Sequence, residues 1–436
     1  MAFCKTVWSG VHILPNGDVR LCSINNDATN ESGVGRDKDG NVINILTHDF
    51  AQAINSDKHL AVRSADLQDE STWHSMCSCC EHKELATNSN KDPDSGFVSR
   101  RFYLDSVVST DINADNFSNY SVDGTVQYAP SSLDLRFGNL CNQACVQCGP
   151  FYSNKWYADW EVYGEPTGWG PSLTHLKENE LGKIVKENEV RWWESDIWWN
   201  KFTQILPSIT HIYLTGGEPM VVSEHERLLD TIIDAGYAPQ VFLEYDSNCT
   251  AIKSNLFEKW AKFKKVHIRA SMDAIQNRYE LIRYGGKWET FTKNIKKIQE
   301  LSKETNGRVA LTAVSSCYQM STLFSMVEAE DWCNNNGFKF HMRFVDSPFV
   351  HSVNYLPPNA KRELIDFYSK YPDSTTAQTI INYLKSIDDK WELSHVAGYI
   401  KFMDALDARR NTNWKEVLPD VWNFLKKYKI SFIIKR

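Results

Sequence analysis

Short apolar runs typical of β-strands alternate with segments that suit helices between residues 131 and 346. The runs lie at 132–137, 210–214, 240–245, 265–270, 308–314 and 338–344. Strands joined by helical crossovers form right-handed βαβ units, so the pattern predicts an α/β fold with a parallel sheet or barrel. Six strands fit an open, partial barrel better than a closed one of eight. Ligands are then expected at the carboxyl ends of the strands.

Two further regions flank this alternating part. Residues 1–105 resemble a small α+β domain, in which two short strands surround the turn Pro15-Asn-Gly-Asp and a helical stretch follows. Residues 347–436 are charged and helical in pattern, with Pro357-Pro358 near their start. We therefore expect three parts: an N-terminal Cys-rich domain at 1–105, the barrel at 131–346 and a helical C-terminal extension at 347–436.

Composition narrows the functional class. The chain has 436 residues, of which 42% are apolar and 24% charged, and this excludes a disordered or collagen-like protein. A net charge of −7 argues against a basic sheath around nucleic acid, although a local basic groove is compatible with it. The start of the chain lacks a signal-peptide pattern, and no stretch reaches the roughly 18 apolar residues that span a bilayer. We expect a cytoplasmic protein with no membrane partner.

The cysteines are concentrated towards the N-terminus and suit metal binding in a reducing compartment. Cys141, Cys145 and Cys148 form a C-x3-C-x2-C motif just after the first predicted barrel strand. Three such thiolates can hold three irons of a [4Fe–4S] cluster and leave the fourth iron open to a substrate or cofactor. The alternatives are a zinc site that lacks its fourth ligand, or cysteines of the core.

A second motif, Thr215-Gly-Gly-Glu-Pro219, lies at the carboxyl end of the second predicted barrel strand. Its two glycines let the backbone approach a ligand closely. The carboxylate of Glu218 can accept hydrogen bonds from an ammonium group. By itself the segment would be read as an ordinary strand-to-helix turn, but its place one strand after the cysteine motif favours a binding role.

The two motifs together resemble the signature of the radical S-adenosylmethionine (SAM) superfamily. The resemblance covers about residues 131–346 and implies a partial (β/α)6 barrel. It implies that Cys141, Cys145 and Cys148 bind a [4Fe–4S] cluster whose open iron is chelated by SAM. Reduction of the cluster would cleave SAM to a 5′-deoxyadenosyl radical that abstracts a hydrogen atom from the substrate. Such an enzyme would be classed as an oxidoreductase or a transferase. The methionine amino group would be bound by Gly216, Gly217, Glu218 and Pro219.

Three more positions resemble SAM contacts of this superfamily. Asn248 follows the third barrel strand, Ser271 follows the fourth, and Arg283 resembles the arginine that reaches the SAM carboxylate. Turn and helix-capping chemistry is the alternative for Asn248, Ser271 and Asp273. Gln147 departs from the family pattern, because the residue before the third cysteine is usually aromatic and backs the adenine.

The N-terminal cysteines form a second set. Cys4, Cys22, Cys77 and Cys80 follow the pattern C-x12-G-x4-C plus C-x2-C, which resembles the twitch (half-SPASM) auxiliary-cluster domain of radical SAM enzymes. That domain follows the barrel in the best-known members and precedes it here, as in a set of twitch-domain proteins often encoded by viruses of bacteria. An auxiliary [4Fe–4S] cluster, a structural zinc ion or no metal remain open. Cys79 competes with Cys80 as a ligand.

Three functional hypotheses follow. Resemblance to twitch and SPASM relatives favours a peptide or protein substrate. Seven tryptophans between 156 and 199 belong either to the core or to a stacking surface, and a stacking surface would indicate a nucleotide or nucleobase. A non-catalytic Fe–S binding protein is the third hypothesis, which the intact motifs disfavour. An enzyme of this type would use an electron donor such as flavodoxin or ferredoxin.

Overall fold

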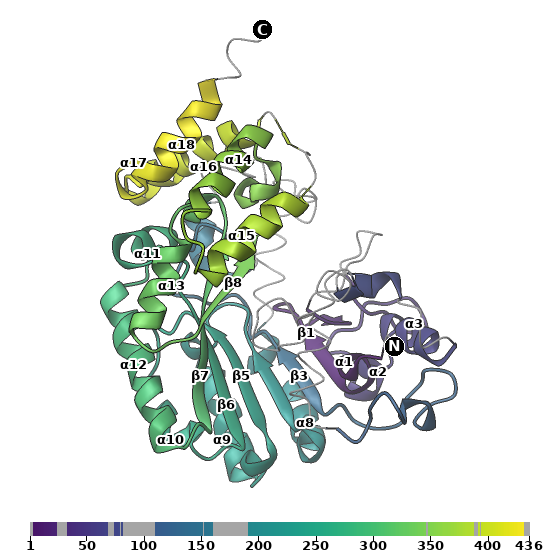
Figure 1. Ribbon diagram of the computed structural model, residues 1–436. Coiled ribbons are helices and arrows are strands. Elements are labelled where there is room, and N and C mark those ends of the chain that lie inside the picture. The colour runs from purple at the N-terminus through teal and green to yellow at the C-terminus, as the bar shows by residue number, and fades with distance from the viewer. Residues whose placement is uncertain are drawn as a thin grey trace.

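A mostly parallel sheet of eight strands forms the centre of the protein in the computed structural model (Figure 1). The structure describes residues 3–23, 33–68, 74–78, 80–81, 110–150, 152–159, 191–345, 348–387, 391–392 and 394–430. The strand order is β2-β1-β3-β4-β5-β6-β7-β8, and every neighbouring pair is parallel except the antiparallel hairpin of β1 and β2. The strands are β1 Gly10–Ile13, β2 Val19–Arg20, β3 Ser132–Leu135, β4 His211–Leu214, β5 Phe242–Ser247, β6 Lys265–Ser271, β7 Val309–Tyr318 and β8 Phe340–Phe344.

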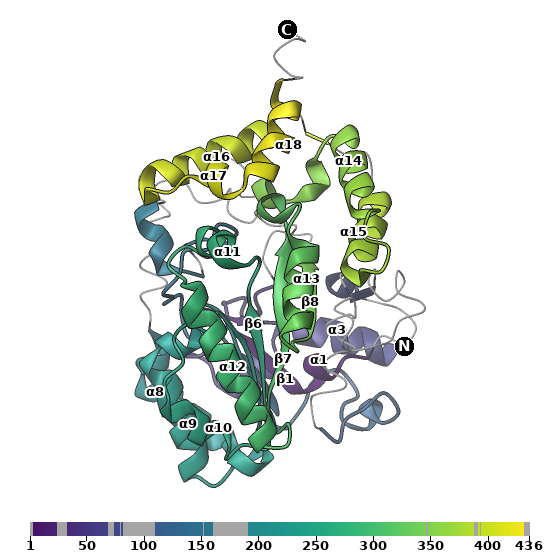
Figure 2. The same ribbon diagram turned by 60° about the vertical axis from the view of Figure 1, so that its left-hand side comes forward.

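The six strands predicted for the barrel are confirmed as β3 to β8. Leu133, Ile212 and Leu243 are neighbours across β3, β4 and β5 and are buried on one face of the sheet. Side chains alternate between the two faces along each strand, so the residues next to them point to the other face. Helices cover this apolar face and run along the outside of the sheet (Figure 2). They are α8 Asp196–Ile205, α9 Ser223–Asp234, α10 Asn255–Trp260, α12 Trp288–Glu304 and α13 Met326–Asn335.

The N-terminal part is joined to the barrel through the sheet. It contains α1 Lys5–Ser9, α2 Phe50–Ile54 and α3 Asp57–Gln68, and the predicted hairpin is confirmed as β1 and β2. Strand β1 pairs in parallel with β3, so the N-terminal part and the barrel share one hydrogen-bonded sheet. A buried hydrogen bond of 2.9 Å from Trp8 Nε1 to Asp66 Oδ2 ties α1 to α3.

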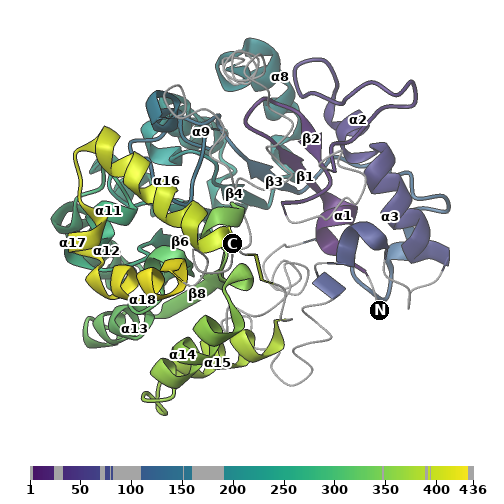
Figure 3. The ribbon, with the colours of Figure 1, turned by 90° about the horizontal axis from the view of Figure 1, so that it is seen from above.

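The described residues from 358 to 430 are mainly helical, as their sequence pattern predicted. They contain α14 Pro358–Tyr368, α15 Thr375–Ser386, α16 His395–Arg410, α17 Trp414–Val417 and α18 Pro419–Ile430. These helices gather at the end of the sheet where α11 (Gln276–Ile282) follows β6 (Figure 1). They share a second apolar core with the loop after β3, including Ala144, Val146 and Trp156. Seen from above, they lie on the side of α11 to α13, whereas α1 to α3 lie on the other side, beyond β1 (Figure 3).

Membrane insertion has no support in the described helices. Over the ranges given above, none of them combines the length and the apolar character that a transmembrane segment requires.

Candidate functional site

The loop that follows β3, residues 139–150, is called the cysteine loop here. Backbone hydrogen bonds hold it against the end of α11. Ala144 N donates to the carbonyl of Tyr284 and Val146 N to the carbonyl of Ile282, each at 2.8 Å. The cysteine loop, which follows β3, is therefore held by a segment that follows β6, although β4 and β5 lie between these two strands in the sheet.

The three thiols of the cysteine loop lie near one another. Burial, followed by the proximity of Cys145, raises the pKa of the Cys141 thiol to about 12. Burial raises the pKa of Cys148 as well, and Cys145 and Cys141 add to that rise through their charges. A bound metal would supply the positive charge that keeps such buried, mutually repelling thiols ionised.

The donor set of this loop fits an iron–sulfur cluster. The ten cysteines that the structure describes form no disulfide. Within the same ranges, no group of three or more His, Cys, Asp and Glu side chains is arranged to chelate a single metal ion. In a cubane cluster each thiolate binds a different iron, so the ligands stand farther apart than those of one ion. Three thiols on one loop would leave one iron without a protein ligand.

The Gly-Gly-Glu-Pro segment after β4 runs directly against the cysteine loop. Glu218 N donates to the carbonyl of Leu140 at 2.8 Å, and Gly217 N donates to that of Gly138 at 3.3 Å. Gly216 has a φ of +112°, which favours glycine, and a Cβ on Gly217 would lie 2.2 Å from the Leu140 oxygen. The sequence predicted a close approach to a ligand; the structure adds that these glycines allow a close approach to the cysteine loop.

The carboxylate of Glu218 joins the segments after β4 and β5. It is 2% exposed and accepts hydrogen bonds from Ser247 Oγ (2.8 Å), Asn248 N (2.7 Å) and Met220 N (3.3 Å). Burial raises its pKa to about 7, although these three donors act in the opposite direction. Because a carboxylate offers about four acceptor positions, about one remains for an ammonium donor.

Asn248 lies beside the first cysteine of the loop. Its Nδ2 donates to Asn142 Oδ1 at 2.8 Å and lies 4.0 Å from Cys141 Sγ. Its Oδ1 accepts from Thr250 Oγ1 at 2.7 Å, and Thr250 Oγ1 accepts from Asn142 Nδ2 at 2.8 Å. This ring of hydrogen bonds connects the turn after β5 to the cysteine loop. Cys141, Glu218 and Asn248, all predicted site residues, therefore meet at one edge of the sheet.

Arg283 also reaches the cysteine loop. Its Nη1 lies 3.8 Å from Cys145 Sγ, and its Nη2 forms a 2.8 Å ion pair with Asp273 Oδ2. Burial opposes the charge of Arg283, but Asp273 and Cys145 outweigh it and raise the pKa of the guanidinium. Asp273 also accepts a 2.5 Å hydrogen bond from Gln147 Nε2. The sequence left turn and helix-capping chemistry as the alternative for Asp273 and did not indicate its ion pair with Arg283.

Ser271 marks the same edge one strand farther along. It is the last residue of β6, faces Ser315 of β7 and lies two residues before Asp273. The segments that follow β3, β4 and β5 thus contact one another at the carboxyl ends of these strands, Ser271 ends β6 beside them, and Arg283 reaches the cysteine loop from the end of α11.

The four N-terminal thiols also converge. Cys4 precedes α1, Cys22 follows β2, and Cys77 and Cys80 lie in the short helical segment that begins at Ser75. Burial raises the pKa of the Cys77 thiol, and the charges of Cys4, Cys22 and Cys80 raise it further. Segments about 55 residues apart thus place their thiols in one group. Cys79, the competing ligand, lies outside the described residues.

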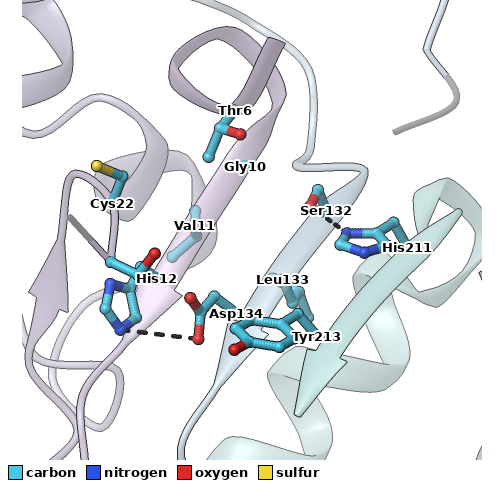
Figure 4. A pocket seen from close by; sticks show the side chains of 11 residues that line it. Thr6, Gly10, Val11, His12, Cys22, Ser132, Leu133, Asp134, His211 and Tyr213 are labelled. Atoms are coloured by element: carbon cyan, nitrogen blue, oxygen red, sulfur yellow. Dashed lines mark hydrogen bonds and ion pairs between the residues drawn. The ribbon is translucent and has the colours of Figure 1, made fainter. Parts of the chain in front are cut away.

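The face of the sheet opposite the helices is polar. His12, Asp134, Tyr213 and Glu244 lie in register across β1, β3, β4 and β5. Figure 4 shows the first three on the same side of their strands, together with His211. We call this the inner face.

Hydrogen bonds and ion pairs compensate the charges of the inner face. Arg269 bridges Glu244 Oε1 at 2.5 Å and Asp246 Oδ1 at 2.6 Å. Glu244 Oε2 lies 3.3 Å from His211 Nε2, and the hydroxyl of Tyr213 donates to Asp246. Although burial opposes ionisation, Arg269 outweighs it and lowers the pKa of Asp246. Charges of both signs on the inner face are therefore paired with one another.

A pocket on this inner face is lined by one of the four N-terminal thiols, Cys22 (Figure 4). Cys22 lines it from the N-terminal part, and His12, Asp134 and Tyr213 line it from the strands. His12 Nε2 lies 3.7 Å from Asp134 Oδ1, and both residues line the pocket. Cys22 therefore borders the inner face.

The tryptophan-rich crossover packs into the interior. The described members Trp156, Trp192, Trp193, Trp198 and Trp199 are all at most 4% exposed. Trp192 packs edge-on against Trp198 with ring centroids 4.8 Å apart. For these five the core interpretation is correct, and a stacking surface for a base is not; Trp160 and Trp169 lie outside the described residues.

Comparison with known proteins gives only distant structural likenesses. No protein-family model and no curated protein matches the chain. Native anSMEcpe with bound AdoMet and Cp18Cys peptide matches at 15% identity and a TM-score of 0.33, over 62% of this chain and 65% of that one. Streptococcus suis SuiB bound to S-adenosylmethionine matches at 13% and 0.33, over 68% and 60%. The chain thus spans less than two thirds of either protein, and such low values establish neither family nor function.

Replacing Gly217 by Ala should separate the segments after β3 and β4. The new Cβ would overlap the backbone oxygen of Leu140, which cannot move aside as a flexible side chain could. We expect a loss of about 1–3 kcal/mol in the free energy of unfolding of the metal-free protein. Gly398→Ala in α16 is the matched control, since nothing lies within 4 Å of that Cβ. Equal unfolding midpoints for the two variants in urea would contradict the close approach.

Glu218 should make the stability of the metal-free protein depend on pH. Its folded pKa of about 7 exceeds the ordinary value of 4.5, so the folded state holds a proton that the unfolded state releases. Stability should therefore fall as pH rises from about 4.5 through 7, by up to about 3 kcal/mol from this group.

The measurement compares wild type with Glu218→Gln at pH 5 and pH 8 by chemical unfolding. Glutamine cannot ionise, so its altered hydrogen bonds change the free energy of unfolding by the same amount at both pH values. The informative quantity is the difference in that free energy between pH 5 and pH 8. The wild type should lose more stability than the variant. A parallel loss in both proteins would assign the pH dependence to other groups.

Proposed function

We propose that this chain is a radical SAM enzyme that modifies a peptide or protein. The observation that carries the proposal is the meeting of three segments at one sheet edge. The cysteine loop follows β3, the Gly-Gly-Glu-Pro segment follows β4, and Asn248 follows β5 with its Nδ2 4.0 Å from Cys141 Sγ. Three thiols would leave one iron of a [4Fe–4S] cluster open, and a buried carboxylate and an arginine lie beside them. This arrangement suits a cluster that binds SAM.

Each residue then has a defined task. Cys141, Cys145 and Cys148 would hold a [4Fe–4S] cluster, which when bound and reduced by a donor such as flavodoxin or ferredoxin supplies the electron that cleaves SAM. Glu218 would accept a hydrogen bond from the methionine ammonium. Arg283 would face the SAM carboxylate while Asp273 holds its guanidinium in place. The chain itself thus binds, orients and excludes water, and the cofactors carry out the radical chemistry.

The group of Cys4, Cys22, Cys77 and Cys80 would hold an auxiliary [4Fe–4S] cluster. Four thiolates leave no iron open, so this cluster would act in electron transfer or in architecture. Its position favours a role near the substrate, because Cys22 lines the pocket on the inner face. A zinc ion is the alternative; it would require these thiols to move closer together than they lie in the metal-free chain, and metal analysis distinguishes the two.

A peptide substrate agrees with the inner face. Polar groups of the inner face such as Asp246, which is 21% exposed, suit the amide dipoles of a peptide chain. The nucleotide alternative depended on exposed tryptophans, and the five described ones are buried.

Metal analysis after anaerobic reconstitution tests the proposal. The wild type should bind about 8 Fe per chain, as two cubes of about 4. The combined change Cys141→Ala, Cys145→Ala and Cys148→Ala should leave about 4 Fe and abolish release of 5′-deoxyadenosine from SAM. Cys333→Ala is the control, because that buried thiol lies in the core of α13. Full iron content in the triple variant would refute the assignment of the loop.

The auxiliary site is tested separately. Cys77→Ala with Cys80→Ala should also leave about 4 Fe, and it should destabilise the protein because the metal would no longer connect the hairpin to a segment about 55 residues later. The thermal midpoint of the reconstituted protein reports the second effect. About 4 Fe and one zinc ion in the wild type would replace the auxiliary cluster by a zinc site.

A further inference from the structure

The C-terminal helical extension contributes one buried charge to the cysteine loop. Arg410 is the last residue of α16, and its side chain is 3% exposed. A buried guanidinium requires a partner, and Asp159 provides it, with Oδ2 accepting from Nη2 at 2.8 Å and from Nε at 3.1 Å. The two residues are 251 positions apart in the chain, so this pair joins α16 to the segment that follows the cysteine loop.

Two aromatic rings enclose the same guanidinium. The centroids of Trp156 and Tyr284 each lie 4.7 Å from Arg410 Cζ, a distance at which cation–π attraction acts. Both aromatic residues are bonded to the cysteine loop. Trp156 Nε1 donates to the carbonyl of Cys145 at 3.0 Å, and the carbonyl of Tyr284 accepts from Ala144 N at 2.8 Å.

Arg410 is separated from Cys145 by one aromatic side chain. The ring of Trp156 lies against the guanidinium, and its Nε1 donates to the Cys145 carbonyl. By comparison, Nη1 of Arg283 lies 3.8 Å from Cys145 Sγ. Packing alone would not require a charge here, because apolar side chains often replace buried ion pairs without loss of stability.

We propose that Arg410 is a positioning residue that clamps the cysteine loop and places a positive charge near Cys145. This inference rests on the proposed function in one respect only: the charge would act on a cluster held by that thiol. A nearby cation stabilises the reduced, more negative state of a cluster and thereby raises its reduction potential. The clamp itself is a property of the metal-free chain.

Hydrogen exchange of the metal-free protein tests the clamp. Arg410→Met should lower the protection of the amides of residues 144–148 by about tenfold, since charge-assisted hydrogen bonds and stacking are lost together. Arg409→Met is the matched control, because Arg409 is 39% exposed and its Nε lies 3.8 Å from Asp159. Should Arg410→Met fail to fold, Arg410→Met with Asp159→Asn removes the unpaired carboxylate and carries the same test. Protection equal to wild type in either folded variant would overturn the clamp.

The reduction potential of the reconstituted cluster tests the charge. Arg410→Met should shift it to more negative values, and Arg410→Lys should leave it close to wild type while still loosening the loop, since lysine lacks the planar fork. An unchanged potential in Arg410→Met would overturn the electrostatic part. If the wild type held no cluster at the three cysteines, the proposed function would fail, and the exchange experiment would still decide the clamp.

Discussion

The close approach of two backbone segments determines the rest of the site. Leu135 and Leu214 lie opposite each other at the ends of β3 and β4, so the segments that follow them leave the sheet at the same height. They meet at the 2.8 Å hydrogen bond from Glu218 N to the Leu140 carbonyl. Only a residue without a side chain fits at Gly217 in this contact. Without it, the carboxylate of Glu218 and the cysteine loop would have no fixed relation.

From that contact the order extends across the sheet edge through hydrogen bonds. Glu218 holds Ser247 and the backbone of Asn248, and Asn248 holds Asn142 beside the first thiol. On the other side of the loop, Arg283 links the second thiol to Asp273. Each strand end thus contributes one connection, and a parallel sheet is what brings these ends to a common edge.

The parts that flank β3 to β8 contact them at different places. Strand β1 extends the sheet from the N-terminal part, which places Cys22 in a pocket with Asp134 and Tyr213. Helix α16 brings Arg410 to the opposite side of the cysteine loop, between Trp156 and Tyr284. The C-terminal helices therefore contact the cysteine loop itself, whereas the N-terminal part joins the sheet at β3.

The sequence by itself determined the local features: the six barrel strands, the N-terminal hairpin, the helical extension and the two motifs at strand ends. Each of these features depends on a periodicity or a residue spacing within a short stretch of sequence. Such patterns can be recognised without knowing which distant residues they contact. The tertiary structure alone decided the pairing of β1 with β3, the burial of Trp192 and Trp198, and the partners of Asp273 and Arg410. These contacts join residues far apart in the chain, and their geometry follows from how the helices pack on the sheet, which no local pattern encodes.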